Sequence, residues 1–263
     1  MSTNDNYRFL IITLMILFVL NDYCFCMSES FNVSHKAFSS AIATWYGAPN
    51  GPGSTGGACG CGNDVTNFPY NSLVSAGNNF LFKSGAGCGA CYQVKCTNNP
   101  ACSGFPITVV ITDECPGSCN SDPVHFDLSG KAIGYLAKPG QAGALRGAGR
   151  INIEYQKVPC SYKASITFKI DLGANPFFVA LAIENVNGDG ELGYVELFPS
   201  NSKSWVPMQR SFGATWKANL PFGGKGPFSV RLTSLESKKT IVAFNAIPAN
   251  WAPGKYYISN VNF

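Results

Sequence analysis

The chain is poor in charge. Only 13% of its 263 residues are Asp, Glu, Lys or Arg, about half the fraction usual in soluble domains. It has no run of lysines and arginines, and its formal net charge is only +4. We therefore predict no interaction with nucleic acid, because such proteins concentrate basic residues in patches. A mildly basic chain has at most a slight attraction for acidic polymers such as uronic-acid polysaccharides.

Long apolar runs are also scarce: residues 9–20 form the only one, and Arg8 precedes it. This run is too short for a transmembrane helix, which needs about 20 apolar residues. A basic residue before a short apolar run is typical of a secretory signal. We predict a signal peptide over residues 1–27, with an uncleaved anchor as the alternative. An Asn-Val-Ser sequon follows, which predicts glycosylation at Asn32.

Cysteine is absent after residue 160, which marks the clearest domain boundary. Of eleven cysteines, two lie in the targeting segment and nine between residues 59 and 160. This density indicates an oxidising compartment and a disulfide-linked first domain. Nine is odd, so at least one thiol is unpaired or pairs between molecules. A zinc site is the less favoured alternative; it would use Cys88, Cys91, Cys115 and Cys119.

Abundant glycine and proline, 28 and 16 residues, predict many turns and few helices. Residues 129–136 form the best short helix candidate, with Ser129 as a possible cap. Residues 51–62 are nearly all small, and no Lys-Ser/Thr pair follows them as in a phosphate-binding loop. We expect this loop to pack against backbone and leave an open cleft above it. Alternating or apolar segments predict strands at residues 91–96, 107–112 and 150–158.

Two carboxylates and one imidazole stand at the ends of two strands that one loop joins. The strand at residues 107–112 ends at Asp113, and the loop closes at His125 and Asp127. If the two carboxylates lie side by side, repulsion and burial should raise the pKa of one of them. No serine-nucleophile motif accompanies His125. It is either a polar cleft residue or a side chain that fixes the loop by hydrogen bonds.

The first strand carries Thr44, Trp45 and Tyr46 before a Gly-Ala-Pro break. Adjacent strand residues normally face opposite sides. Either one of the two aromatic residues belongs to the core, or both line the floor of a cleft.

The ordered motifs resemble those of the expansins. They are TWYGAP at 44–49, GGACG, the cysteine spacing, ITDEC at 111–115, HFDLSG at 125–130, and SLES, IPANW and VNF in the last third. The resemblance is to the beta-expansin branch, which includes grass-pollen group-1 allergens. It implies a mainly β protein: a six-stranded double-psi β-barrel similar to family-45 endoglucanases at 41–160, then an immunoglobulin-like β-sandwich that binds carbohydrate at 161–263.

The resemblance also implies disulfide pairs and sugar contacts. The pairs are Cys59–Cys88, Cys91–Cys160 and Cys96–Cys102, which leave Cys61, Cys115 and Cys119 unassigned. Relatives usually have an aromatic residue where Cys61 stands. The implied polar cleft residues are Thr44, Asp113, His125 and Asp127, and the implied stacking residues are Trp45, Tyr46, Phe178 and Phe212. Where relatives often have Tyr or Trp, a phenyl ring keeps the flat apolar face.

Hydrolysis of a β-glucan needs a proton donor and a second carboxylate across the scissile bond. The resemblance to family-45 endoglucanases places the general acid at Asp127. In these endoglucanases the catalytic base lies shortly after the aromatic residue of the first strand. The corresponding residues in this chain, 47–50, contain no Asp or Glu. Asp64 could replace the base only if its loop folded back over the cleft. We therefore expect no catalytic residue, metal or cofactor.

In the second domain, the stretch at 187–190 resembles part of a calcium loop, but the rest of an EF-hand is absent. We predict a hairpin turn there. Trp205, Trp216 and Trp251 are predicted to be core residues. Segments at sandwich-like spacing predict strands at 166–172, 177–184, 194–198, 205–209, 228–233 and 240–245.

The resulting hypothesis is a secreted, monomeric protein of the plant cell wall. It binds cellulose or a matrix glycan such as xyloglucan or arabinoxylan, and it loosens polysaccharide contacts without hydrolysis. One alternative is an endo-β-glucanase that uses Asp127 as general acid. The other is a barwin-like signalling or defence protein.

Overall fold

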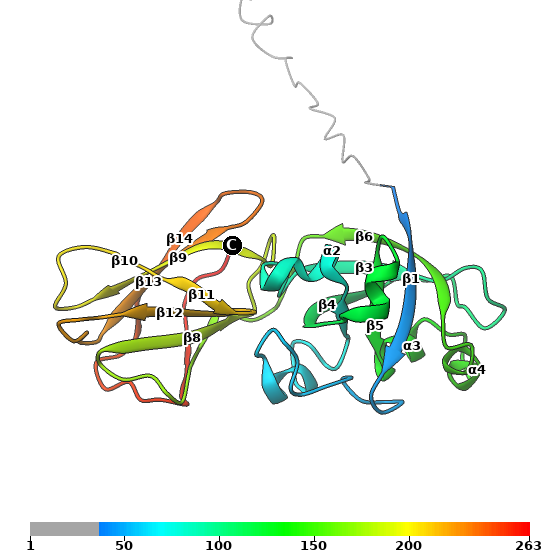
Figure 1. Ribbon diagram of the computed structural model, residues 1–263, viewed down its shortest axis with the longest axis horizontal. Coiled ribbons are helices and arrows are strands. Elements are labelled where there is room, and N and C mark those ends of the chain that lie inside the picture. The colour runs from blue at the N-terminus through cyan, green and yellow to red at the C-terminus, as the bar shows by residue number, and fades with distance from the viewer. Residues whose placement is uncertain (1–36) are drawn as a thin grey trace, which may run out of the picture. The chain divides into compact units, whose positions relative to one another are not determined.

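The computed structural model describes residues 37–263 (Figure 1). The predicted signal peptide and the sequon at Asn32 lie outside the described residues. Across residues 37–263, no helix has the length and apolar character needed to cross a membrane.

Six strands close into a barrel in the order β1-β5-β2-β4-β3-β6. The pairs β1–β5 and β2–β4 are parallel, whereas β1–β6, β2–β5, β3–β4 and β3–β6 are antiparallel. This confirms the predicted double-psi barrel. The strands are β1 (Ser39–Tyr46), β2 (Val74–Gly77), β3 (Cys91–Lys95), β4 (Ile107–Glu114), β5 (His125–Ser129) and β6 (Ile151–Val158).

Helices are few and short, as the glycine and proline content predicts. The predicted helix cap is present: Ser129 Oγ accepts a hydrogen bond from the Ala132 amide at 3.0 Å. The α-helices are α2 (Asn79–Phe82), α3 (Gly130–Tyr135) and α4 (Ala142–Gly147), and the 3-10 turns are η1 (Gly62–Thr66), η2 (Lys83–Gly85) and η3 (Gly117–Ser121).

The core of the barrel sets the direction of the polar side chains on β5. Phe126 and Leu128 are fully buried in it. The Phe126 ring packs on Tyr92 and Tyr155, with 5.4 Å between ring centroids in both pairs. Because side chains alternate along a strand, His125 and Asp127 must point to the opposite face of β5.

The second half forms two packed sheets, β10-β9-β13-β14 and β11-β12-β8-β7-β15. Their inner faces share one core that includes the fully buried Phe168, Leu181 and Phe228. This confirms the predicted sandwich. The strands are β7 (Thr167–Ile170), β8 (Phe178–Glu184), β9 (Leu192–Pro199), β10 (Val206–Pro207), β11 (Gln209–Phe212), β12 (Thr215–Asn219), β13 (Phe228–Ser234), β14 (Thr240–Ile247) and β15 (Tyr256–Ile258).

The predicted hairpin turn at residues 187–190 is wrong. The strands on either side, β8 and β9, belong to different sheets, so the segment is a crossover. Gly188 forms a β-bridge with Cys160 at the end of the barrel. Asp189 Oδ2 accepts hydrogen bonds from the amides of Glu236 and Ser237 at 2.8 and 2.7 Å. The asparagine and glycine residues at 187–190 therefore belong to a crossover segment that packs against the end of the barrel, rather than to a hairpin turn.

Of the three tryptophans predicted as core, Trp216 is buried and Trp251 packs partly buried against the same core. Trp205 instead stacks between Phe198, 5.3 Å away between ring centroids, and the Arg231 guanidinium, 4.5 Å from its ring.

Four disulfides link the barrel region. They include the three pairs that the resemblance implies, and the fourth is Cys115–Cys119. The four cysteines of the alternative zinc site are thus all in disulfides. Cys61 is free and buried, and burial raises the pKa of its thiol well above the ordinary value.

Barrel and sandwich meet through backbone that glycine allows to come close. A Cβ at Gly89 would lie 2.5 Å from the Gly190 carbonyl oxygen, and one at Gly213 would lie 2.4 Å from that of Ala58. The Ala214 amide donates to the Cys59 carbonyl at 3.0 Å. A side chain at either glycine would therefore push the two domains apart.

A buried carboxylate anchors the same junction. Glu191 has no exposed side-chain surface; it forms ion pairs with Lys157 and, at 3.0 Å, with Lys83. The exposed Glu236 also contacts both lysines, at 2.7 and 3.8 Å. Because the lysines come from the barrel and both acids from the sandwich, the network fixes the two domains to each other.

Replacing Glu191 with Gln should lower the free energy of unfolding by about 3 kcal/mol, because it removes the one fully buried carboxylate of the network and leaves Lys157 and Lys83 with only the exposed Glu236. Chemical denaturation measures this change. Glu236→Gln is the matched control, since an exposed pair contributes about 1 kcal/mol or less. Equal losses in the two variants would contradict a special role for Glu191.

Stability should also depend on pH through Glu184. Its Oε1 is buried without a hydrogen-bond partner, and burial, with a smaller effect of Asp64, raises the pKa to about 8. The unfolded carboxyl ionises near pH 4.3, so the folded state holds more protons between the two values. The free energy of unfolding should therefore fall as pH rises from about 4 to 8, by about 4 kcal/mol.

Glu184→Gln should remove most of this slope and stabilise the protein at alkaline pH, whereas the exposed Asp171→Asn should not. Denaturation curves across the pH range test this prediction. An unchanged slope in Glu184→Gln would show that other groups cause it.

Candidate functional site

Strand register places three of the predicted polar residues in one row across the barrel. Thr44 on β1 pairs with Asp127 on β5, Asp127 pairs with Ala76 on β2, and Ala76 pairs with Asp113 on β4. Paired residues present their side chains on the same face of a sheet. The Cα atoms of the two aspartates, two strands apart, are separated by about 10 Å. Ala76, which lies between them in this row, is buried.

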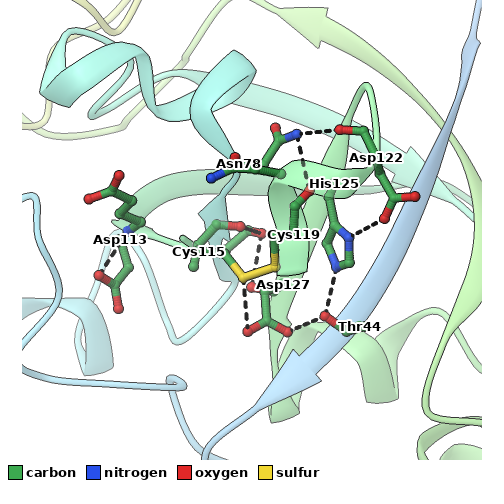
Figure 2. The surroundings of a disulfide bond; sticks show 12 residues. Thr44, Asn78, Asp113, Cys115, Cys119, Asp122, His125 and Asp127 are labelled. Carbon is green, nitrogen blue, oxygen red and sulfur yellow. Dashed lines mark hydrogen bonds and ion pairs between the residues drawn. A yellow bond between two sulfur atoms is a disulfide. The ribbon is translucent and has the colours of Figure 1, made fainter. Parts of the chain in front are cut away.

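Asp127 lies at the centre of this row. Its Oδ1 accepts a hydrogen bond from Thr44 Oγ1 at 2.5 Å, and the Cys115 sulfur lies 3.9 Å from its Oδ2 (Figure 2). Burial raises the pKa of Asp127, and the charge of Asp113 adds to the rise, while Thr44 and His125 oppose it. The expectation that one of the two carboxyls has a raised pKa holds, with burial as the main cause.

His125 links the row to a second carboxylate, as Figure 2 shows. Its Nε2 lies 2.9 Å from Thr44 Oγ1 and its Nδ1 lies 2.7 Å from Asp122 Oδ2. Arg150 donates to both oxygens of Asp122 at 2.9 and 2.6 Å. These two hydrogen bonds hold the pKa of Asp122 down at about 2, with His125 as a further cause. Asp122 is therefore a carboxylate.

The loop that carries Asp122 is fastened at two points. Asn78 Nδ2 donates to the Asp122 carbonyl at 2.9 Å, and the Cys115–Cys119 disulfide closes the segment before it. Figure 2 shows Asn78 and the disulfide close to His125. His125 thus contacts both the polar row, through Thr44, and the loop, through Asp122. Its two predicted roles, a polar residue of the site and a side chain that fixes the loop by hydrogen bonds, are therefore compatible.

Asp113 is bound to the glycine-rich loop. Its Oδ1 accepts hydrogen bonds from the amides of Ala58 and Glu114 at 2.7 and 2.8 Å, and Tyr46 O–H donates to its Oδ2 at 3.4 Å. A Cβ at Gly57 would lie 2.7 Å from the Thr112 carbonyl, which explains why this loop has small residues. Asp113 therefore braces the loop against the end of β4.

The two aromatic residues of β1 face opposite sides. Tyr46 lies on the same face as Thr44, and burial followed by the charges of Asp113 and Asp127 raises its pKa above the ordinary value. Trp45 packs partly buried against the barrel core, and its Nε1 donates to the Arg146 carbonyl at 3.0 Å. A sugar contact is thus favoured for Tyr46 and stays a prediction for both.

The glycine-rich loop continues from Asp113 to the sandwich. A Cβ at Gly60 would lie 3.0 Å from the Phe212 ring. Asp64, beyond the glycines, pairs with Lys169 Nζ at 2.8 Å and accepts a hydrogen bond from Tyr256 O–H at 3.2 Å. Asp64 is therefore bound to the sandwich, which argues against the predicted alternative that it folds back over Asp127.

The outer face of the five-stranded sheet carries aromatic and apolar side chains. On β8, Val179 and Leu181 point into the core, so Phe178 points outward. The predicted Phe212 is 53% exposed, and Tyr256, which lies in the same cross-strand row, is 48% exposed. We call Phe178, Phe212 and Tyr256 the aromatic face.

Sequence reasoning missed two residues of the site, Asp122 and Tyr256. No local pattern distinguishes Asp122 from other loop carboxylates, because its partner Arg150 is 28 positions away. Tyr256 stands in a three-residue strand next to proline and glycine, which hid the strand. The Tyr-Tyr-Ile alternation at 256–258 was the available signal.

Two family models match the chain. A model described as "Expansin C-terminal domain" matches residues 166–248, and one described as "Lytic transglycolase" matches residues 74–155. The first range lies within the sandwich and the second within the barrel.

The fold and site define a two-domain protein with a row of polar side chains on the barrel and an aromatic face on the sandwich. Expansin-B4 of Arabidopsis thaliana is 52% identical over 95% of this chain and 96% of its own length. Putative expansin-B2 of the same plant is 51% identical over 97% of this chain and 95% of its own length. Expansin-B11 of Oryza sativa subsp. japonica is 51% identical over 86% of this chain and 78% of its own length. The chain belongs to the expansin family, in its beta-expansin branch.

Solved structures share the fold. The apo expansin of Clavibacter michiganensis superposes with a TM-score of 0.65 at 22% identity, covering 86% of this chain and 98% of its own. An aspartate-to-asparagine mutant of that expansin, solved in complex with cellohexaose, superposes with a TM-score of 0.65 at 21% sequence identity. This comparison also covers 86% of this chain and 98% of the other.

The role of Asp113 as a brace is testable. Asp113→Ala should make the Ala58 amide exchange with solvent roughly fivefold faster, because this amide loses its one hydrogen bond to Asp113, which contributes about 1 kcal/mol. Hydrogen exchange followed by NMR measures the rate. Glu114→Ala removes the neighbouring carboxylate and should leave the rate unchanged. A protected Ala58 amide in Asp113→Ala would contradict this role.

Proposed function

We propose that this protein is secreted to the plant cell wall, where it binds polysaccharide along one strip and loosens contacts between polymers without cutting them. The strip runs from Thr44 and Asp127 over the glycine-rich loop to the aromatic face. The observation that carries the proposal is that one loop joins the two sites: it is hydrogen-bonded to Asp113 at Ala58 and passes so close to the Phe212 ring at Gly60 that a side chain there would meet the ring. Membership of the expansin family supports the same role.

The chemistry of a strip of this kind suits a neutral glucan. Hydroxyl and carboxyl groups in the cleft can exchange hydrogen bonds with sugar hydroxyls, and flat rings can stack on pyranose faces. Each ring contributes on the order of 1 kcal/mol, from a few tens of Å² at about 25 cal/mol per Å². Several weak contacts of this size hold a chain while permitting it to slide. Cellulose, xyloglucan and arabinoxylan are the candidate polymers, and the protein would act as a monomer.

The cleft has an acid in Asp127 but lacks a free base opposite it. Inverting glycosidases place their two carboxyls about 6.5–9.5 Å apart on either side of the sugar. Asp113 is the nearest partner in the row, with its Cα about 10 Å from that of Asp127, but both stand in one row on one sheet. Three protein donors also occupy the oxygens of Asp113. This arrangement favours binding over hydrolysis.

The position of Asp113 in the same row as Asp127 nevertheless defines the second candidate function, an endo-β-glucanase with Asp127 as acid and Asp113 as base. The first test applies pure protein to isolated cell walls under constant load and measures creep and released reducing ends together. We expect creep without reducing ends. Creep that scales with released sugar, with both lost in Asp113→Asn and Asp127→Asn, would establish the enzyme instead.

The second test concerns the aromatic face. Phe212→Ala and Tyr256→Ala should each weaken binding to insoluble cellulose roughly fivefold, since each ring contributes on the order of 1 kcal/mol. Phe244→Ala is the matched control, because Phe244 is 73% exposed on β14 of the other sheet. Depletion binding isotherms measure the effect. If all three variants bound cellulose equally well, the aromatic face of the sandwich would not be part of the polysaccharide-binding strip.

A further inference from the structure

A continuous series of hydrogen bonds connects the surface of the barrel to its cleft. It runs from Arg150 to Asp122, from Asp122 to the imidazole of His125, from His125 to Thr44, and from Thr44 to Asp127. His125 is only 2% exposed, so the inner part of the series is shielded from water. The number of hydrogens in such a series restricts which protonation states it can hold.

The outer end of the series is fixed. Arg150 is always charged and holds Asp122 as a carboxylate, which can only accept hydrogen bonds. His125 Nδ1 lies 2.7 Å from that carboxylate and must therefore carry a hydrogen. The variable hydrogens are those on His125 Nε2, Thr44 Oγ1 and Asp127.

Thr44 has one hydroxyl hydrogen but two neighbours, and this leaves two fully bonded arrangements. In the first, Nε2–H donates to Oγ1 and Oγ1–H donates to Oδ1, so His125 is an imidazolium and Asp127 a carboxylate. In the second, the protonated Asp127 donates to Oγ1 and Oγ1–H donates to Nε2, so both groups are neutral. The two arrangements contain the same number of protons and carry the same total charge.

We propose that Thr44 relays a proton between His125 and Asp127, so that the imidazole and the cleft carboxyl share one proton, with Asp122 as the residue that positions the imidazole. In the transfer, the Nε2–H bond breaks as an Oγ1–H bond forms, and the original Oγ1–H proton passes to Oδ1. No oxidant or further reactant is needed. Removal of the shared proton leaves two acceptors facing one hydroxyl hydrogen, so one hydrogen bond is lost.

Other charged groups act on the site without joining the relay. Asp113 and Tyr46 lie on the cleft side of Asp127 and are hydrogen-bonded to each other. The Cys115–Cys119 disulfide beside Asp127 does not titrate. Arg150, which directly precedes β6, faces Asp122 and is half exposed. The neutral Thr44 is thus the sole hydrogen-bonded link between His125 and Asp127 in residues 37–263.

The relay itself follows from the hydrogen bonds; only the purpose that we assign to the shared proton rests on the proposed function. A shared proton lets Asp127 meet a sugar hydroxyl as a carboxylate or as a neutral carboxyl, with no exchange of protons with water. That ability suits a polymer that slides past the cleft and presents hydroxyls in changing orientations.

The test is a pH titration of the full mature chain with ¹⁵N-labelled histidine, followed by NMR at Nδ1 and Nε2. The chain has two histidines, and a His35→Gln variant identifies the signal of His125. With the relay intact, Asp127→Asn should move the midpoint of the His125 titration down by at least one pH unit, a tenfold change. In a Thr44→Val background, the same substitution should move it by less than a third as much.

Thr44→Ser keeps a hydroxyl and should restore the coupling. Equal shifts in the wild-type and Thr44→Val backgrounds would show that the two groups interact only through space, which would overturn the relay. Amide spectra of each variant verify that it is folded. Cellulose binding is measured separately: its absence in the wild-type protein would reject the proposed function and would leave the titration result intact.

Discussion

The parallel pairing of β1 with β5 is the constraint on which the site depends. It sets Thr44 beside Asp127, and the buried Phe126 forces the carboxyl to the face opposite the core. A shift of one residue in this register would turn every side chain of β5 to the other face. The rest of the cleft, including the imidazole and its carboxylate partner, is built outward from this one pair.

The second constraint is the close approach of barrel and sandwich. Glycine pairs let the backbones meet, and the buried Glu191 joins lysines from the barrel to the sandwich. The glycine-rich loop is held at both ends, by Asp113 in the cleft and by Lys169 on the sheet. Polymer binding across both domains requires this connection, because a flexible junction would separate the cleft from the aromatic face.

Much of the fold could be predicted from the sequence because its signals are local. The cap at Ser129, the apolar run of β4, the alternation on β6 and the end of the cysteines at 160 all depend on neighbouring residues. The ends of the strands around residues 107–127 already point to Asp113, His125 and Asp127. The resemblance to expansins supplied the barrel topology and the place of Thr44 among the polar residues, which composition alone does not define.

The parts that were missed depend on contacts between distant segments. Asp122 becomes a fixed anion only when the segment entering β6 brings Arg150 to it. Tyr256 reaches the aromatic face because β15 pairs with β7, nearly 90 positions earlier, at Lys169. The hairpin predicted at 187–190 failed because turn residues also suit a crossover that docks on Cys160.

These constraints lead to one central claim: a glucan lies along both domains and stays intact. A crystal structure of the protein soaked with a long glucan oligomer tests it most directly. The account predicts one continuous chain of sugar rings that passes Asp127 and continues onto Phe212. An oligomer cleaved beside Asp127, or one bound to a single domain only, would contradict it.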